Sequence, residues 1–334
     1  MAPYIFPAGK LPADVLSRLL DDFGGAPDDV RLGPAVGEDA CALNVGDHVV
    51  LAATDPITMT SRDIGRYAVI INANDIAVSG ARPRWFLATV LLPVGADAEM
   101  VESVFAAMRP ALDEVGAALV GGHTEVTSAV NQPVIVGQML GIAEDGRFVT
   151  TSGAVPGDVV VQIAAAPVEG AAVLASEASD RLGALSADVL DDALRAAHDP
   201  GISVVESALM ARDLGATAMH DPTEGGLAAG LHELATAAGT AIRVDRDQVR
   251  WFEPGLQVCR ALGADPWGTL ASGCLLATFA PEQAEAAVDA FRSNDVPAAA
   301  IGVVESGAGV HDIDDDAVPW PERDEALRVM GQQR

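Results

Sequence analysis

Carboxylate side chains recur in this sequence beside glycines, prolines and the ends of apolar runs, where several of them could bind one hard cation. The segments that carry them read VGEDACAL (36–43), ATDP (53–56), INANDIA (71–77), VGGHTEVT (120–127) and HDPTEGGL (220–227). Oxygen ligands of this kind suit Mg²⁺ when metal ions, rather than a phosphate-binding loop, neutralise a triphosphate. The sequence has no Walker A loop, GxGxxG fingerprint, GxSxG elbow or HExxH helix, which removes the commonest nucleotide-binding and hydrolase interpretations.

Four aspartates stand at positions from which they could reach a common site. Asp39 follows a glycine turn, and Asp55 follows a strand expected over 48–54, which the next residue, a proline, is expected to end. Asp75 interrupts an apolar helix, where an unpaired carboxylate would be costly, and Asp221 ends a strand. Taken singly they could be turn formers, a helix defect and a helix N-cap. Taken together they indicate a cation site.

Two glycine pairs could bring backbone N–H groups to phosphate oxygens. Gly121–Gly122 and Gly225–Gly226 each follow an expected strand end, and the missing Cβ atoms permit close approach. His123 and Glu125 are candidates for a general base or for positioning an acceptor. Lys10 is the only lysine among 20 Lys and Arg residues, and its compact ammonium suits a γ-phosphate. The alternative is one lysine left by chance near a terminus.

The elements that must position these residues fall into two halves of similar style. Apolar β-branched runs predict strands, and Ala-rich stretches predict helices. In the first half we expect strands over 48–54, 85–92 and 133–143, with helices over 64–79 and 96–116. In the second half we expect strands over 159–164, 217–220, 274–279 and 300–304, with helices over 168–179, 187–197, 202–214, 225–238 and 281–292. The strands and helices together predict an α+β chain. The turn-rich stretch 146–158 predicts a boundary between two domains, 1–153 and 154–334.

The charge balance excludes several partners. The 334 residues include 48 Asp and Glu against 20 Lys and Arg, a formal net charge of −28. Such a surface repels nucleic acid phosphates and anionic membranes, and no apolar run approaches the roughly 20 residues that span a bilayer. The N-terminus lacks a basic and an apolar signal region, so we expect a cytoplasmic protein. Three scattered cysteines, none in a CxxC pair, are expected to be buried thiols.

An acidic chain with one lysine is typical of a halophilic protein, because multimolar salt screens charge within about 3 Å. A high-GC genome that replaces Lys by Arg is the alternative origin. If most carboxylates form a solvating coat, only those in specific local contexts bear on function.

In order and spacing, the motifs resemble the superfamily of ATP-dependent enzymes that contains aminoimidazole ribonucleotide (AIR) synthase, selenophosphate synthetase, thiamine monophosphate kinase and the hydrogenase maturation protein HypE. GEDACAL is similar to the family element GDDAAV, ATDPIT to TTD, and NANDIAVSGARP to NDIAxxGAxP. GGHTEVT is similar to a phosphate and metal loop, HDPTEGGLA to the HypE element DPTRGGLA, and LGADPWGTLASGCLLAT to LGLDPxxLASEGxLLA. The resemblance covers about residues 9–305.

The resemblance implies an AIR synthase-like fold whose N-terminal α/β domain binds ATP and Mg²⁺ and pairs with a second copy through a shared β-barrel. It implies a homodimer with each ATP at the dimer interface, and a monovalent cation such as K⁺ is a further candidate cofactor. The metal ligands carried over are Asp39, Asp55, Asp75 and Asp221. The ATP-binding set carried over is Asp55, Asn74, Gly121, Gly122, His123, Thr124, Thr223, Gly225 and Gly226. Lys10, His123 and Glu125 are the catalytic candidates, and Lys10 lies where relatives have a mobile phosphate-facing segment.

Departures from the family patterns decide among its members. The HypE tail ends in a reacting cysteine, whereas this sequence ends VMGQQR. Selenophosphate synthetase has a reactive Cys or selenocysteine beside its N-terminal lysine, and here the segment reads PAGKLP. The kinase signature DxSDGL is replaced by DPTEGGL, and the purine-specific residues of AIR synthase are absent.

We therefore expect an ATP- and Mg-dependent phosphotransfer enzyme, HypE-like but without a C-terminal cysteine, that activates an amide, carboxylate or phosphate oxygen of a small acceptor. A nucleotide-binding regulatory or assembly protein without turnover is the first alternative. The second is a hydrogenase maturation factor whose partner protein supplies the cysteine.

Overall fold

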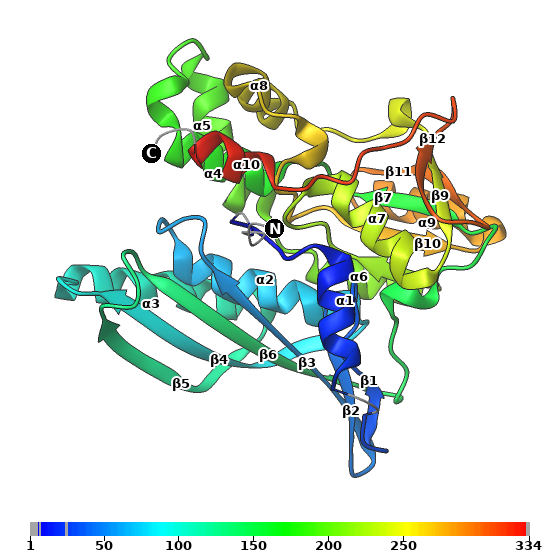
Figure 1. The fold of residues 1–334 in the computed structure, drawn as a ribbon, viewed down its shortest axis with the longest axis horizontal. Helices are drawn as coiled ribbons and strands as arrows, with labels where there is room; N and C mark the ends of the chain where they lie inside the picture. The colour runs from blue at the N-terminus through cyan, green and yellow to red at the C-terminus, as the bar shows by residue number, and fades with distance from the viewer. Residues whose placement is uncertain (1–5, 7, 24–25, 332–334) are drawn as a thin grey trace, which may run out of the picture.

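The chain folds into two mixed six-stranded sheets, each covered by helices (Figure 1). The computed structural model describes residues 6, 8–23 and 26–331. The first sheet is built from residues 30–143 and the second from residues 159–312. The predicted α+β class with two sheets is thus confirmed, while the limits 1–153 and 154–334 stay predictions.

The first sheet has the strand order β1-β2-β3-β6-β4-β5. All neighbouring strands are antiparallel except β4 and β5, which run parallel because helix α3 connects them. The bounds are α1 (Ala13–Asp21), β1 (Val30–Leu32), β2 (Cys41–Val45), β3 (His48–Ile57), α2 (Ile64–Val78), β4 (Arg82–Pro93), α3 (Ala98–Val115), β5 (Ala118–Thr127) and β6 (Val134–Ala143).

The second sheet has the order β12-β9-β11-β7-β10-β8 and is antiparallel except for the β9–β12 pair. Its strands are β7 (Val159–Ile163), β8 (Ala218–His220), β9 (Ala241–Val244), β10 (Leu275–Phe279), β11 (Ala298–Glu305) and β12 (Gly309–Asp312). Its helices are α4 (Val168–Glu177), α5 (Ala187–Arg195), α6 (Val205–Asp213), α7 (Gly226–Ala238), α8 (Glu253–Leu262), α9 (Pro281–Ser293) and α10 (Glu325–Gly331).

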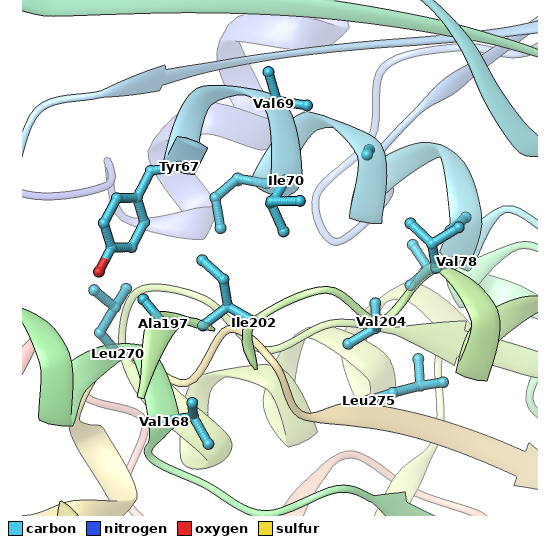
Figure 2. Packing of buried hydrophobic residues seen from close by; sticks show 14 of the residues in the cluster. Tyr67, Val69, Ile70, Val78, Val168, Ala197, Ile202, Val204, Leu270 and Leu275 are labelled. Atoms are coloured by element: carbon cyan, nitrogen blue, oxygen red, sulfur yellow. The ribbon is translucent and has the colours of Figure 1, made fainter. Parts of the chain in front are cut away.

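Helix α2 lies between the first sheet and the second half of the chain (Figure 1). Every one of its residues is buried, as is typical of a core helix, although Arg66, Asn72, Asn74 and Asp75 are polar. Tyr67, Ile70 and Val78 of α2 lie opposite Ile202 and Val204 of the second half (Figure 2). One apolar core therefore spans the two halves, and α2 is its centre.

Polar side chains of α2 tie the halves together inside this core. Asn74 Nδ2 donates to Ile202 O at 2.9 Å, and Asn74 Oδ1 accepts from Val204 N at 2.9 Å. Arg66 Nε donates to Ala197 O at 3.2 Å. Buried backbone groups must be paired, so these contacts fix how the second half sits on α2.

Two strands run further than the sequence predicts. The proline at position 56 was expected to end β3, but β3 continues to Ile57. Beyond Ala52 it pairs with β6 alone, and Asn72 of α2 takes the place of a neighbouring strand. Asp55 N donates to Asn72 Oδ1 at 2.9 Å, and Asn72 Nδ2 donates to Asp55 O at 3.2 Å. These two hydrogen bonds hold the backbone of Asp55 in an extended conformation, as a neighbouring strand would.

Segment 121–127 is likewise a strand rather than a loop. It forms most of β5, the edge strand of the first sheet. Gly122 has φ +146° and lies against β4 so closely that a Cβ atom would overlap the backbone of Ala88. The glycine pair therefore serves the packing of β5 on β4. Within the described residues, no helix is both long enough and apolar enough to cross a bilayer.

The variant Asn74→Ala tests the role of this amide in the core between the two halves. It leaves Ile202 O and Val204 N buried without partners, so we expect a loss of about 2–4 kcal/mol in the free energy of unfolding. Urea unfolding followed by fluorescence measures it. Asn44→Ala, at an exposed position of β2, is the matched control. Equal stability of the two variants would contradict this role.

Candidate active site

Three of the predicted aspartates converge at the junction of the two halves. Asp55 comes from the end of β3, Asp75 from the last turn of α2, and Asp221 from the loop after β8. Asp75 and Asp221 are buried, with 5% and 1% of their surfaces exposed. Asp39, from the segment before β2, adds a fourth charge that acts on all three.

The pKa shifts of these carboxylates reflect the charges of their neighbours. Burial is the main cause that raises the pKa of Asp55 to about 6, and Glu224 and Asp39 add to it. Burial and the charges of Asp55, Asp221 and Asp39 raise the pKa of Asp75 well above its usual range. Burial and Asp39 do the same to Asp221, against the opposing charge of His220. Like charges this close disfavour each other's ionised forms.

The aspartate carboxylates could bind a hard cation, but they are not already arranged around one. Among the residues that the structure describes, no three His, Cys, Asp or Glu side chains already stand as a ligand group. Both carboxylate oxygens of Asp221, however, are buried and accept no hydrogen bond from the described chain. A buried carboxylate without a donor calls for a cation, and Asp55 and Asp75 supply further oxygen ligands beside it.

A chain of polar contacts runs from Asp39 to Lys10. His220 is buried and lies 2.8 Å from Asp39 Oδ2 through Nδ1 and 2.9 Å from Glu233 Oε2 through Nε2. Burial opposes ionisation of His220, but the two carboxylates outweigh it and raise its pKa well above the usual range. Asp39 and Glu233 are thus held by one imidazolium.

Lys10 completes this chain. Its Nζ donates to Thr223 Oγ1 at 3.2 Å and to Glu233 Oε1 at 3.4 Å, and it lies 3.7 Å from Glu224 Oε2. Desolvation lowers the pKa of Lys10, but Glu233 and Glu224 more than offset it, so the pKa is raised. Glu233 in turn has its pKa lowered to about 2, because Lys10 and His220 outweigh the effect of its burial. Lys10 is therefore held beside the carboxylate cluster.

Two site residues were missed at the sequence level. Glu233 interrupts the apolar helix α7 much as Asp75 interrupts α2, and that interruption was a usable signal. Glu224 stands inside a recognised motif, yet its charge could be assigned to solvent until the structure placed Lys10 against it. Position along the chain gave no reason to connect either residue with Lys10.

Gly225 and Gly226 of the segment 220–227 do not offer free N–H groups. Gly225 N donates to Asp324 Oδ2 at 2.7 Å, and Gly226 N donates to Thr223 O at 3.0 Å. Both glycines have positive φ, +83° and +64°, so their role is to form the turn that starts α7. The expectation that they would donate to phosphate oxygens is wrong for this arrangement. Thr223 remains at the site through its contact with Lys10.

The residues of the segment 120–127 lie away from the aspartates within one chain. The strand register aligns Asp55 with Gly137, Gly137 with Ala88, and Ala88 with Gly122. Three strand spacings separate Asp55 from Gly122, about 14 Å. His123 and Glu125 follow on the same exposed strand, with His123 Nε2 3.1 Å from Glu125 Oε2. One chain therefore does not bring Gly121, Gly122, His123, Thr124 or Glu125 to its own carboxylates.

The geometry of Asn74 also disagrees with its assignment to ATP. Both ends of its amide are bonded to backbone groups of the second half, as described above. It is completely buried, and its amide N and its amide O are both already bonded to backbone groups. Asn74 therefore positions the neighbouring Asp75 instead.

Two covered sheets joined at a buried acidic cluster define a two-domain α+β protein with a candidate active site at their junction. Family models match both parts: the AIR synthase related protein N-terminal domain over residues 37–143 and the C-terminal domain over residues 155–314. The chain belongs to the AIR synthase-related family, as the sequence motifs predicted.

Its relatives include hydrogenase maturation proteins. The chain is 31% identical over 285 residues to the hydrogenase expression/formation protein HupE of Azotobacter chroococcum mcd 1, covering 81% of this chain and 80% of that protein. It is 30% identical over 241 residues to the carbamoyl dehydratase HypE of Rhodobacter capsulatus, covering 71% of this chain and 68% of that protein. These relatives indicate an enzyme.

Solved structures share the fold. A crystal structure of HypE in complex with ATP is 26% identical, with a TM-score of 0.70, and the match covers 88% of this chain and 92% of that one. Thiamine monophosphate kinase from Aquifex aeolicus is 19% identical, with a TM-score of 0.69, covering 91% and 96%, and shows the fold alone.

The carboxylate cluster predicts how stability depends on pH. The pKa of Asp55, Asp75 and Asp221 is higher in the folded chain than in the unfolded one, so the unfolded chain releases their protons first. The contribution of these three groups to the free energy of unfolding must then fall as pH rises from about 4 through 6 and beyond. We expect Asp221→Asn to flatten this loss by about 1–3 kcal/mol in metal-free buffer.

Chemical unfolding at pH 4.5, 6 and 8 measures this dependence. Asp47→Asn, at an exposed turn position, is the matched control and is expected to keep the wild-type slope. If the free energy of unfolding of Asp221→Asn falls with pH as steeply as that of the wild type, Asp221 does not contribute to this pH dependence.

Proposed function

We propose that this chain is an ATP- and Mg-dependent phosphotransfer enzyme that activates an oxygen of a small acceptor. The observation that carries the proposal is the convergence of Asp39, Asp55, Asp75 and Asp221 beside the single lysine. Four carboxylates and one ammonium provide sites for both a metal and the phosphates it would carry. The ATP complex of the 26% identical HypE supports the nucleotide half of the proposal.

The aspartates would hold Mg²⁺, with Asp221 contributing from the second half of the chain and the other three from the first. Bound there, the ion would neutralise the charge that develops on the transferred phosphoryl group. Lys10 would contact a terminal phosphate, because its Nζ lies at the site and Thr223 and Glu233 orient it. Glu233 and His220 act as positioning residues, since they link Lys10 to Asp39. A monovalent cation such as K⁺ is part of the same proposal.

We further propose a homodimer formed through the β5 edge. Nine of the ten residues of β5 are exposed, including Leu119, Val120 and Val126, at 45%, 55% and 57%. A long exposed apolar edge strand is a template for pairing with another chain. Such pairing would let His123 and Glu125 of one protomer act near the site of its partner, a role that one chain alone does not allow.

The acceptor belongs to the amide, carboxylate or phosphate class, whose oxygen becomes a leaving group once phosphorylated. A 30% identical relative is named a carbamoyl dehydratase, which favours an amide within that class. A regulatory or assembly protein that binds ATP without turnover is the second candidate, and a maturation partner protein fits either candidate. The structure of a HypE–HypF complex, 22% identical, shares the fold. ADP release with and without added acceptors separates turnover from binding.

The variant Asp75→Asn tests the metal assignment. It removes one charge from the cluster while keeping the side-chain shape, so we expect the affinity for ATP in the presence of Mg²⁺ to fall about tenfold or more, ~1.4 kcal/mol. Calorimetric titration measures the affinity. Asp47→Asn is the control. An affinity for ATP·Mg equal to that of the wild type in folded Asp75→Asn would show that the metal assignment is wrong.

The single lysine allows a direct test of the phosphate contact. An amine-reactive reagent can label only Lys10 and the N-terminal amine, and mass spectrometry of peptides distinguishes the two. We expect ATP·Mg to slow labelling of Lys10 at least fivefold. Without nucleotide, Glu233→Gln should speed it, because losing the carboxylate lowers the pKa of Lys10. Labelling unaffected by ATP in a protein that binds ATP would remove Lys10 from the site.

Light scattering tests the proposed dimer. We expect the wild type to have twice the chain mass of 34.2 kDa. Val120→Lys places a charge on the pairing edge and should yield monomers. Val155→Lys, at an exposed position in the segment of the chain that connects β6 to β7, is the control and should leave the mass unchanged. A monomeric wild type at micromolar concentration would refute the proposed interface.

A further inference from the structure

The chain after β12 returns across the second half to α10 and contacts helix α7 on the way (Figure 1). We call residues 313–331 the C-terminal segment. The ring of His232, in the middle of α7, stacks on that of Trp320, with the ring centroids 4.9 Å apart. At the start of α7, Gly225 N donates to Asp324 Oδ2 at 2.7 Å. The C-terminal segment therefore holds α7 at two points.

Both points of contact are next in sequence to residues that hold Lys10. Gly225 directly follows Glu224, whose Oε2 lies 3.7 Å from Lys10 Nζ. His232 directly precedes Glu233, whose Oε1 accepts from Lys10 Nζ at 3.4 Å. One planar peptide unit joins each pair of neighbours, so a displacement of the C-terminal segment is passed on to the carboxylates around Lys10.

Asp324 makes the contact that a cap of α10 alone does not require. It is almost completely buried, with 3% of its surface exposed, and its Oδ1 accepts from Ala326 N at 2.7 Å. Burial is the main cause that raises the pKa of Asp324 to about 7, against the N–H groups of Gly225 and Ala326. Asn or Ser can cap a helix without burying a charge. The second oxygen of the carboxylate, however, also bonds the turn before α7.

The next residue makes a similar contact with a different turn. Glu325 Oε2 accepts from Asp265 N at 2.9 Å and from Arg328 at 2.6 Å. Asp265 lies between α8 and β10, in a turn that carries none of the residues found at the site. Two consecutive carboxylates of the C-terminal segment thus hold two turns, of which one belongs to the site and the other does not.

We propose that Asp324 is a positioning residue that fixes the turn 221–225 at the site. This turn carries Asp221, Thr223 and Glu224, so docking of the C-terminal segment and binding of ATP·Mg are coupled. The inference rests on the proposed phosphotransfer function, because it takes ATP·Mg as the occupant of the site. Coupling of this kind is reciprocal: if the docked segment favours binding, bound ATP·Mg stabilises docking by the same factor.

The variant Asp324→Asn keeps the side-chain shape and removes one of the two acceptor oxygens. We expect the affinity for ATP·Mg at pH 8 to fall about fivefold or more. Without nucleotide, an amine-reactive reagent should label Lys10 about threefold faster, because displacement of Glu224 lowers the pKa of Lys10. Glu325→Gln weakens the neighbouring contact and is the matched control, expected to leave both measurements within about 1.5-fold of the wild type.

Urea unfolding of both variants shows how far each lowers stability. Equal effects of Asp324→Asn and Glu325→Gln on affinity and labelling would mean that Asp324 only stabilises the fold, and would overturn the proposal. Unchanged affinity and labelling in Asp324→Asn would overturn it as well.

Hydrogen exchange of the wild type tests the coupling without any variant. We expect ATP·Mg to slow exchange about threefold or more in peptides from 321–331 as well as from 221–227, because Gly225 N and Ala326 N both donate to Asp324. Peptides from α9 are the internal control. Slowing confined to 221–227 overturns the coupling. A wild type that does not bind ATP·Mg refutes the phosphotransfer function instead, and labelling of Lys10 without nucleotide still decides the role of Asp324.

Discussion

The structure is organised around the burial of like charges between its two halves. Asp75 of α2 and Asp221 of the loop after β8 come from different halves of the chain, are almost fully buried, and lie within electrostatic reach of Asp55 and Asp39. Such a cluster costs free energy in the isolated chain, since each carboxylate disfavours ionisation of the others. The apolar core around α2 offsets this cost by packing both halves against one helix (Figure 2). A ligand that brings positive charge would relieve the strain, which is how a destabilised site becomes a binding site.

Helix α2 contributes to both the apolar core and the carboxylate cluster. Its apolar side chains join the two halves, and its polar residues have separate roles. Asn72 completes the edge of β3 at Asp55, Asn74 bonds to the second half, and Asp75 lies at the site. Three functions thus follow one another within four residues of a single buried helix. Local substitution there would alter the fold and the site together, and for that reason stability must be measured beside binding in any variant of this helix.

Much of the fold was predictable from the sequence because its signals are local. Apolar runs and Ala-rich stretches identified most strands and helices of both sheets, and the interruption of α2 by Asp75 marked a buried charge. The continuation of β3 through Pro56 was not predictable, since it depends on Asn72, which lies 17 residues away. The free edge of β5 was missed for a similar reason. A pair of glycines reads as a loop until the register shows that Gly122 must fit against β4.

The aspartates and Lys10 were predictable one by one, but the contacts that join them were not. Asp39, Asp55 and Asp221 stand beside turn signals and Asp75 interrupts an apolar helix. Lys10, His220 and Glu233, by contrast, meet only through long-range folding. The HypE element DPTRGGLA, which this loop resembles, has an Arg at the place of Glu224, so the loop of this chain bears a negative charge where that element bears a positive one. Lys10 lies 3.7 Å from Glu224 and supplies a cation from another part of the chain. A chain that uses arginine everywhere else retains a lysine at this point, where a compact ammonium fits between Thr223, Glu224 and Glu233 and a planar guanidinium would present a different geometry.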